Sequence, residues 1–119
     1  MRTGTLSLEV FSADDFSLEH REEISISSNL LQLKLKAGMR GADYVLLDDF
    51  EKDGTRVLRV RVIKDNPEYN PGGPKDNPKN YRFWNLAKFE LQVNNCKGLV
   101  KAQQLLKDDR LIRVSFIPD

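Results

Sequence analysis

The chain has 119 residues, a length that accommodates one domain with one hydrophobic core. Hydrophobic residues make up 39% of it and charged residues 31%, which is typical of a globular protein rather than a disordered one. The sequence contains no apolar run of about 18 residues, so we expect no membrane-spanning helix and no membrane partner. The first residues lack the apolar segment of a secretion signal, so we expect none.

A single cysteine, Cys96, and a single histidine, His20, exclude several kinds of site. One cysteine cannot form a disulfide within the chain, and the two residues together cannot build a Cys/His zinc site. His20 lies in an acidic stretch, so we interpret it as a surface residue, and we interpret Cys96 as a structural thiol. This cysteine content fits a reducing, cytoplasmic location.

The net charge of +1 hides an uneven distribution of charge along the chain. Residues 1–53 contain six Lys or Arg and eleven Asp or Glu, whereas residues 54–119 contain thirteen and seven. The second half can therefore present a basic surface that the total charge does not reveal.

Alternation of apolar and polar residues predicts β-strands along most of the chain. In order, the predicted extended segments are residues 5–11, 24–26, 31–36, 44–47, 56–63, 81–93 and 110–117. The polar and acidic residues 12–23 predict a loop, and two glycines predict a turn at 37–41. Before that turn, Lys34 and Lys36 share the face that we expect in solvent, because leucines occupy the alternate positions.

Asp53 and Gly54 stand between two alternating segments and predict a tight β-hairpin. The Asp-Gly pair favours the left-handed backbone that a two-residue hairpin turn requires. In the strand that follows, Arg59 and Arg61 share one face, opposite a face made of apolar residues.

The segment 64–80 is the most unusual part of the sequence. It contains four of the five prolines and two of the seven glycines, which argues against both sheet pairing and helix formation. We predict a long structureless loop, and such loops in compact domains are usually functional or disordered. Tyr69, Lys75 and Lys79 are its candidate binding residues, because a loop of this composition offers little to bury a side chain.

A strongly alternating strand is predicted after this loop. Tyr81 and Phe83 fall on the face that continues into apolar residues, so we interpret both as core residues. Arg82, Trp84 and Lys88 share the other face, where cations flank the only tryptophan. For Trp84, burial at the end of a barrel and contact with a ligand are both open.

Residues 99–107 are the one segment whose pattern favours a helix, with Leu99, Ala102 and Leu106 on one stripe. Five or six strands with one late helix, and no alternation of strands with helices, predict a mainly β, antiparallel fold. We expect one domain over residues 1–119. Its expected form is a small five-stranded, OB-like barrel with the helix before the last strand, rather than a two-sheet sandwich.

We do not expect an enzyme. Pairs of adjacent aspartates stand at 14–15, 48–49 and 108–109. Neighbours on a strand point to opposite faces, so such pairs do not converge on a substrate, and we interpret them as loop and helix-end residues. No phosphate-binding glycine pattern, nucleophile elbow or metal-binding helix is present, and we expect no cofactor or metal.

Cations and aromatic residues around the 64–80 loop favour binding of single-stranded nucleic acid. Aromatic side chains stack on bases, at about 1–3 kcal/mol per base, while lysines and arginines contact phosphates. The candidate residues are Lys34, Lys36, Arg59, Arg61, Tyr69, Lys75, Lys79, Arg82, Trp84 and Lys88. An alternative is a protein-interaction β-barrel, such as a virion or conjugation component, that binds no nucleic acid and docks its proline-rich loop on a partner.

Parts of the chain resemble the phage-type single-stranded-DNA-binding proteins. Residues 81–88 look like the aromatic strand and Leu-Ala step of bacterial-type members, and residues 109–118 are similar to the closing strand of short phage members. By pattern the resemblance covers residues 44–118. It implies an OB fold, binding of single-stranded DNA without sequence specificity, no catalysis and a homo-oligomer, with a dimer expected first. It also implies a role in replication or recombination, with partner proteins of those processes, in the host cytoplasm if a phage encodes the chain.

Overall fold

The computed structural model of the chain describes residues 3–30, 32–35, 43–94 and 96–119. These residues form eight β-strands. The strands are β1 (Gly4–Phe11), β2 (Leu18–Ile26), β3 (Gln32–Leu35), β4 (Asp43–Lys52), β5 (Thr55–Asp65), β6 (Phe83–Gln92), β7 (Val100–Leu105) and β8 (Leu111–Pro118). Helix is limited, in the described part, to the 3-10 turn η1 (Pro78–Asn80), and no helix there could cross a membrane.

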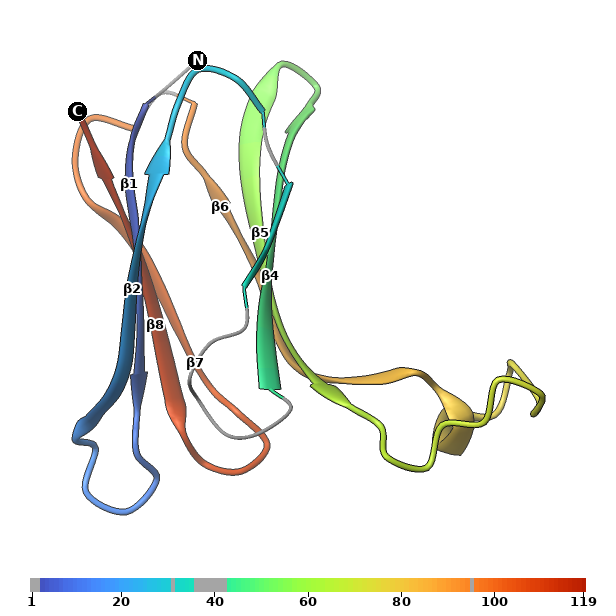
Figure 1. Cartoon of the computed structure of the whole chain (residues 1–119). Coiled ribbons are helices and arrows are strands. Elements are labelled where there is room, and N and C mark those ends of the chain that lie inside the picture. Colours follow the sequence, from blue (N-terminus) through green and yellow to red (C-terminus); the bar gives the residue numbers. More distant parts are fainter. Residues whose placement is uncertain (1–2, 31, 36–42, 95) are drawn as a thin grey trace.

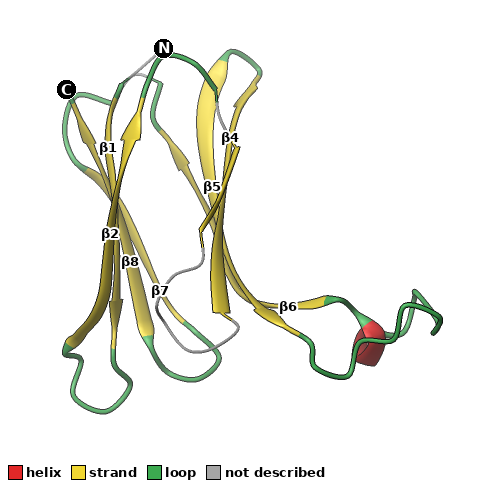
Figure 2. Cartoon of the chain, in the orientation of Figure 1, coloured by secondary structure: helices red, strands yellow, loops and turns green. Residues whose placement is uncertain are grey.

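The strands form two antiparallel four-stranded sheets that face each other (Figure 1). Sheet A has the order β2-β1-β8-β7 and sheet B the order β3-β4-β5-β6. Figure 2, in which every strand is yellow, shows that strands make up most of the chain. Strand order follows chain order around the molecule, and β8 returns to pair with β1. The predicted mainly β, antiparallel fold is confirmed. The chain does not form the predicted five-stranded barrel, because its strands divide into two separate sheets.

The hydrophobic core lies between the two sheets. Its buried residues include Leu6, Leu8 and Val10 of β1, Val45 and Leu47 of β4, Leu58, Val60 and Val62 of β5, and Ile112, Val114 and Phe116 of β8. These are alternate residues along each strand, and the apolar face predicted for residues 56–63, opposite Arg59 and Arg61, is confirmed. Burial of each such side chain contributes about 1.5–3 kcal/mol, which makes this layer the main source of stability.

The predicted hairpin at Asp53 and Gly54 is confirmed. The two residues join β4 to β5, and their φ angles are 53° and 77°. Two successive left-handed residues make a type I′ turn, whose twist matches that of the flanking strands. The turn sets the register in which Arg59 and Arg61 point away from the core.

The predicted helix at residues 99–107 is wrong, because strand β7 occupies Val100–Leu105. Val100 pairs with Phe116 and Ala102 with Val114, so alternate residues of this segment face the core. An edge strand exposes most of its side chains, and the polar residues that it tolerates obscure the two-residue period. Pairing with β8 then overrides the local helical preference.

The predicted loop at residues 12–23 is wrong in its second half, where β2 begins at Leu18. β2 is also an edge strand, and charged side chains suit such an edge because they discourage pairing with other chains. The predicted segment 31–36 corresponds to β3, whereas the turn predicted at 37–41 lies outside the described residues.

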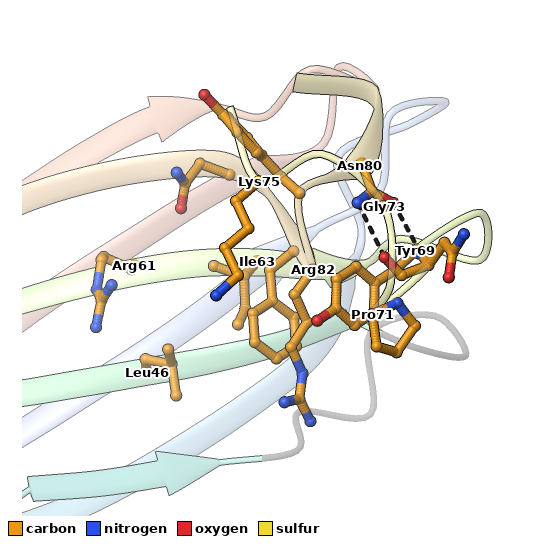
Figure 3. Close-up of a pocket in the computed structure, with 13 residues that line it drawn as sticks. Leu46, Arg61, Ile63, Tyr69, Pro71, Gly73, Lys75, Asn80 and Arg82 are labelled. Carbon is orange, nitrogen blue, oxygen red and sulfur yellow. Dashed lines mark hydrogen bonds between the residues drawn. The ribbon is translucent and has the colours of Figure 1, made fainter. Parts of the chain in front are cut away.

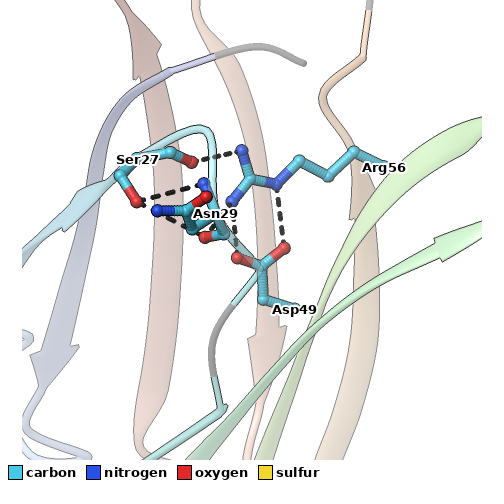
Figure 4. A network of polar contacts seen from close by, with 4 residues as sticks. All are labelled: Ser27, Asn29, Asp49 and Arg56. Carbon is cyan, nitrogen blue, oxygen red and sulfur yellow. Dashed lines mark hydrogen bonds and ion pairs between the residues drawn. The ribbon is translucent and has the colours of Figure 1, made fainter.

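Buried arginines reinforce the sandwich. Arg56 donates to the two carboxylate oxygens of Asp49, at 2.9 and 2.6 Å, and to the Ser27 carbonyl at 2.6 Å (Figure 4). Arg110 is 2.6 Å from Asp43 and therefore ties the β7–β8 turn to the first residue of β4. Both arginine side chains are fully buried.

Candidate functional site

The connection between β5 and β6, residues 66–82, projects from the end of the sandwich opposite the chain termini (Figure 1). We call it the 66–82 loop. We predicted a structureless loop from its prolines and glycines, and this prediction is wrong. Its two ends are joined by a hydrogen bond from the Asn66 amide to the Arg82 carbonyl at 3.1 Å, and it contains η1.

Asparagine side chains hold the 66–82 loop in shape. The buried Asn66 donates from its side-chain amide to the carbonyl oxygens of Lys79 and Tyr81, at 2.9 and 2.6 Å. Asn80 accepts from the Asn70 N–H at 2.7 Å and donates to the Asn70 carbonyl at 2.9 Å. An asparagine side-chain amide both donates and accepts hydrogen bonds. It can therefore replace the backbone hydrogen bonds between strands where proline prevents them.

A groove of about 410 Å³ lies between the 66–82 loop and the outer face of sheet B (Figure 3). We call it the loop groove. Three cations and three aromatic residues line it: Arg61, Lys75, Arg82, Tyr69, Tyr81 and Phe83. No carboxylate is among the described residues that line it. The groove therefore combines positive charge with aromatic surface.

The three cations come from different elements. Arg61 lies on β5, Arg82 directly precedes β6, and Lys75 reaches from the loop toward the strand that carries Ile63 (Figure 3). Arg61 is 3.0 Å from Asp48, which partly neutralises it. Within the described part of the chain, Lys75 and Arg82 have no carboxylate partner, and the Arg82 guanidinium lies 5.3 Å from the centre of the adjacent Phe83 ring.

The aromatic rings of the loop groove are accessible. Tyr69 is 38% exposed and Tyr81 47% exposed, while Phe83 is half-buried. The prediction that Tyr81 and Phe83 are core residues is therefore wrong. The β5–β6 ribbon continues past the sandwich here, so no second sheet covers these two residues (Figure 1).

A β-bulge in β6 changes which face its residues occupy. Val62 pairs with Ala87, but Ile63 pairs with Asn85, so Leu86 is an extra residue in the ladder. Residues of β6 before the bulge consequently point to the face opposite the one that simple alternation predicts.

The bulge separates two residues that we predicted on one face. Lys88 pairs with Arg61 and lies on the outer face of sheet B, whereas Trp84 pairs with Lys64 on the other side of the ribbon. Trp84 is partly buried and lines a second hollow of about 400 Å³ together with Lys79 and other residues. Trp84 and Tyr69 therefore do not share one groove.

The remaining predicted residues lie near the loop groove or outside the described residues. Arg59 is on the outer face of sheet B, 2.9 Å from Glu90 and 4.8 Å from the centre of the Phe50 ring. Lys34 occupies the position of β3 that pairs with Leu46, and Lys36 lies outside the described residues. Of the ten predicted residues, the loop groove brings together four: Arg61, Tyr69, Lys75 and Arg82.

Sequence reasoning missed Tyr44, which borders a further hollow beside the loop groove, shared with Tyr69 and Arg82. The Tyr44 hydroxyl donates to the Asp65 carboxylate at 3.1 Å, and this hydrogen bond raises the pKa of Tyr44. The hydrogen bond also engages the carboxylate of Asp65, which lines this further hollow. Tyrosine and aspartate are 21 residues apart, so only the β4–β5 pairing reveals their contact.

The single histidine and the single cysteine lie apart from the loop groove. His20 is partly buried in β2, with its Nε2 atom 3.1 Å from a Glu22 oxygen, so it is less exposed than we predicted. The Cys96 thiol is 3.6 Å from the Val93 carbonyl. Among the described residues, no three histidine, cysteine, aspartate or glutamate side chains are grouped so that they could hold a metal ion.

Comparison of the chain with protein families, curated proteins and solved structures finds no match. A function must therefore rest on the chemistry of the loop groove.

Proposed function

We propose that the chain binds single-stranded nucleic acid, DNA in the first instance, in the loop groove. The observation that carries this proposal is the lining of the groove: three cations and three aromatic rings with no carboxylate among the described residues. Proteins bind single strands by this pairing of features, since cations attract the phosphates and rings stack on the bases.

The groove has two walls that suit an extended strand. One wall is the outer face of sheet B with Arg61, and the other is the 66–82 loop with Tyr69 and Lys75. The asparagine hydrogen bonds hold the loop wall in place before any ligand arrives. A preformed wall lowers the entropy cost of binding, because less of the protein has to become ordered.

The cations are not equivalent as phosphate ligands. Arg59 and Arg61 are each about 3 Å from a carboxylate, at 2.9 and 3.0 Å, so a phosphate would have to compete with that carboxylate. Arg82 and Lys75 have no such competitor among the described residues. We therefore expect Arg82 and Lys75 to contribute more to affinity than Arg59. The sequence alone did not distinguish these three residues as candidates for phosphate binding.

The groove favours binding that does not depend on sequence. Stacking tolerates every base, because every base has an aromatic face. The amide of Asn80, which could read a base edge, is engaged by the Asn70 backbone within the loop. Binding of this kind suits a protein of replication or recombination, the role that the resemblance of residues 81–88 implies.

The proposal is tested by measuring the affinity for a fluorescent poly-thymidine oligonucleotide at several salt concentrations. Tyr69→Ala should weaken binding about 5- to 150-fold, the equivalent of roughly 1–3 kcal/mol for one stacked base. Arg82→Ala should weaken binding and lower the slope of log affinity against log salt by about 0.7, the value for one phosphate contact on a single strand.

Matched controls are Phe16→Ala and Lys97→Ala, which remove an exposed ring and an exposed cation that do not line the groove. Both should leave affinity and salt slope unchanged. Absence of binding by the native chain at low salt, or equal losses in the control variants, would contradict the proposal. In the first case the projecting loop would be better explained as a docking element for another protein.

A further inference from the structure

A hollow of about 360 Å³ lies beside the loop groove, and we call it the Tyr44 hollow. The residues that line it are Tyr44, Asp65, Asn66, Tyr69, Arg82 and Phe83. Three of these, Tyr69, Arg82 and Phe83, also line the loop groove, so the two spaces share a wall. A volume of this size lies within the range of about 300–1,000 Å³ that is typical of pockets for small ligands.

The sheet places a carboxylate and aromatic side chains on one face at this point. Tyr44 of β4 pairs with Ile63 of β5, and Asp65 lies two residues beyond Ile63 on the same strand. Paired residues share a face of a sheet, and so do residues two apart along a strand, so Tyr44 and Asp65 lie on the same face. Asp65 in turn pairs with Phe83, which places a second aromatic residue next to the carboxylate.

Asp65 is the one carboxylate among the described residues that line the Tyr44 hollow. An ionised carboxylate has two oxygens that accept hydrogen bonds and no group that donates one. The Tyr44 hydroxyl donates to the Oδ2 atom at 3.1 Å, and within the described part of the chain no hydrogen bond to the Oδ1 atom is formed. The tyrosine therefore orients the carboxylate and leaves it able to accept hydrogen bonds from a ligand.

The other polar groups near Asp65 do not compete with it as acceptors. The hydrogen bond to Asp65 and its negative charge raise the pKa of Tyr44, so this hydroxyl stays protonated and continues to donate. The side chain of Asn66 is engaged by the backbone of the 66–82 loop through both its amide group and its oxygen. The hydrogen-bonding character of the hollow is therefore set by Asp65.

Guanine is the base whose Watson–Crick edge matches a carboxylate. Its N1–H and its 2-amino group are adjacent donors, and two carboxylate oxygens can accept from them together. Thymine offers one donor between two acceptors on this edge. Adenine and cytosine place their amino group beside an acceptor nitrogen, which a carboxylate oxygen repels. A carboxylate in a base-sized hollow therefore selects guanine.

We propose that the Tyr44 hollow binds one guanine base, with the Asp65 carboxylate accepting from N1–H and from the 2-amino group. The rings of Tyr69 and Phe83 provide the stacking surface, and Arg82 remains the ligand of a neighbouring phosphate. This inference rests on the proposed function, since the strand in the loop groove delivers the base. Stacking in the groove accepts every base, and Asp65 adds a preference at one position.

The test compares oligothymidines of about eight nucleotides whose central base is thymine, guanine, hypoxanthine, adenine or cytosine. Guanine should raise the affinity of the native chain about 5- to 150-fold over thymine, the discrimination of one bidentate contact. Hypoxanthine lacks only the 2-amino group, so its oligonucleotide should bind between these two. Adenine stacks as a purine but does not match the carboxylate, so it should bind much more weakly than guanine.

Asp65→Asn replaces one of the two acceptors with a donor and keeps the size of the side chain. The preference for guanine over thymine should fall below about twofold in this variant, because the bidentate contact is lost. Glu68→Gln is the matched control: it removes the same charge from an exposed residue that does not line the hollow, and it should keep the native preference. Circular dichroism checks that both variants are folded, and the oligonucleotide series needs no variant.

Deoxyguanosine monophosphate separates this inference from the proposed function. Added alone and followed by NMR, it should shift the backbone amides of Tyr44 and Asp65, and deoxythymidine monophosphate should not. Binding of this nucleotide but of no oligonucleotide would support the guanine site and contradict the proposed function. A guanine preference in oligonucleotides without binding of the free nucleotide would support a site that acts within a strand.

Three results would overturn the guanine site while leaving the proposed function intact. The first is equal affinity of the native chain for all five oligonucleotides. The second is equal affinity for guanine and hypoxanthine, because the 2-amino group would then make no contact. The third is a guanine preference that Asp65→Asn retains in full.

Discussion

Arg56 is a fully buried charge whose partners determine whether it stabilises the fold. Its guanidinium is bound by both oxygens of Asp49 and by the Ser27 carbonyl, which lies in the connection from sheet A to sheet B. Burying a charge is costly unless it is paired and hydrogen-bonded, so the pair stabilises the fold only as a unit. Asp48, the neighbour of Asp49, points to the opposite face and contacts the partly exposed Arg61.

We predict that Asp49→Ala lowers the free energy of unfolding by about 3–5 kcal/mol, because it leaves the Arg56 guanidinium buried without a carboxylate. Asp48→Ala removes only a partly exposed ion pair and should cost less than about 1 kcal/mol. Chemical denaturation of the two variants measures the difference. If Asp49→Ala does not fold, the double variant Asp49→Leu, Arg56→Met should recover a folded protein, since it leaves no charge alone. Equal losses for Asp49→Ala and Asp48→Ala would contradict the account.

At the scale of residues, side-chain pairs that join distant parts of the chain limit what can be predicted from the sequence. The prediction that adjacent aspartates point to opposite faces holds for Asp48 and Asp49, but their placement in a loop is wrong, because both lie within β4. The arginine that pairs with Asp49 is seven residues away across a hairpin, and the one that pairs with Asp43 is 67 residues away. Such pairs become visible only once the strand register is known.

At the scale of elements, the 66–82 loop shows how side chains can order a segment that lacks regular structure. Its Asn-Pro repeats, Asn66-Pro67 and Asn77-Pro78, were visible in the sequence and predicted a loop. The hydrogen bonds of Asn66 and Asn80 across the loop were not visible, because they join residues that only the folded ribbon brings together.

We predict that Asn80→Ala loosens the 66–82 loop without affecting the sandwich. The variant loses hydrogen bonds to Asn70 on both sides of the loop, while the core contains no residue of this segment. Limited proteolysis should cut the loop several-fold faster, and the thermal unfolding midpoint should stay unchanged. Asn94→Ala, which removes a hydrogen bond to the Gly54 carbonyl elsewhere, should not change cleavage within the loop. Unchanged cleavage in Asn80→Ala would show that the asparagines do not order the loop.

Strand alternation predicted the central strands and the edge strand β3, and it failed at the two edges of sheet A and at the bulge in β6. The strands of the centre, β1, β4, β5 and β8, have one fully buried apolar face, so their two-residue period is clear. The edge strands β2 and β7 lack it: residues 18–23 of β2 were predicted as a loop, and β7 was predicted as a helix. In β6 the extra residue Leu86 reverses the alternation, which moved Trp84 to the other face from Lys88.

At the scale of the whole molecule, the chain presents two separate outer faces with different chemistry. The outer face of sheet B, with the projecting loop, gathers cations and aromatic rings in the loop groove. The outer face of sheet A carries charged side chains that pair with one another, Arg21 with Glu23 and Arg113 with Glu9, each at 3.0 Å. The uneven charge of the sequence pointed to the basic second half, and the structure places Arg61, Lys75 and Arg82 of that half in one groove. The division into two sheets was missed because β7 and most of β2, the edge strands of sheet A, were not predicted.

The most direct test of the central claim is to map by NMR which backbone amides shift when a short poly-thymidine oligonucleotide is added at low salt. The account predicts saturable shifts concentrated at Arg61 and Ile63 and in residues 69–85, with none on the outer face of sheet A. These shifts should diminish as salt is raised, because bound phosphates displace counterions. Absence of saturable shifts, or shifts centred on sheet A, would contradict the assignment of the loop groove as a binding site for single strands.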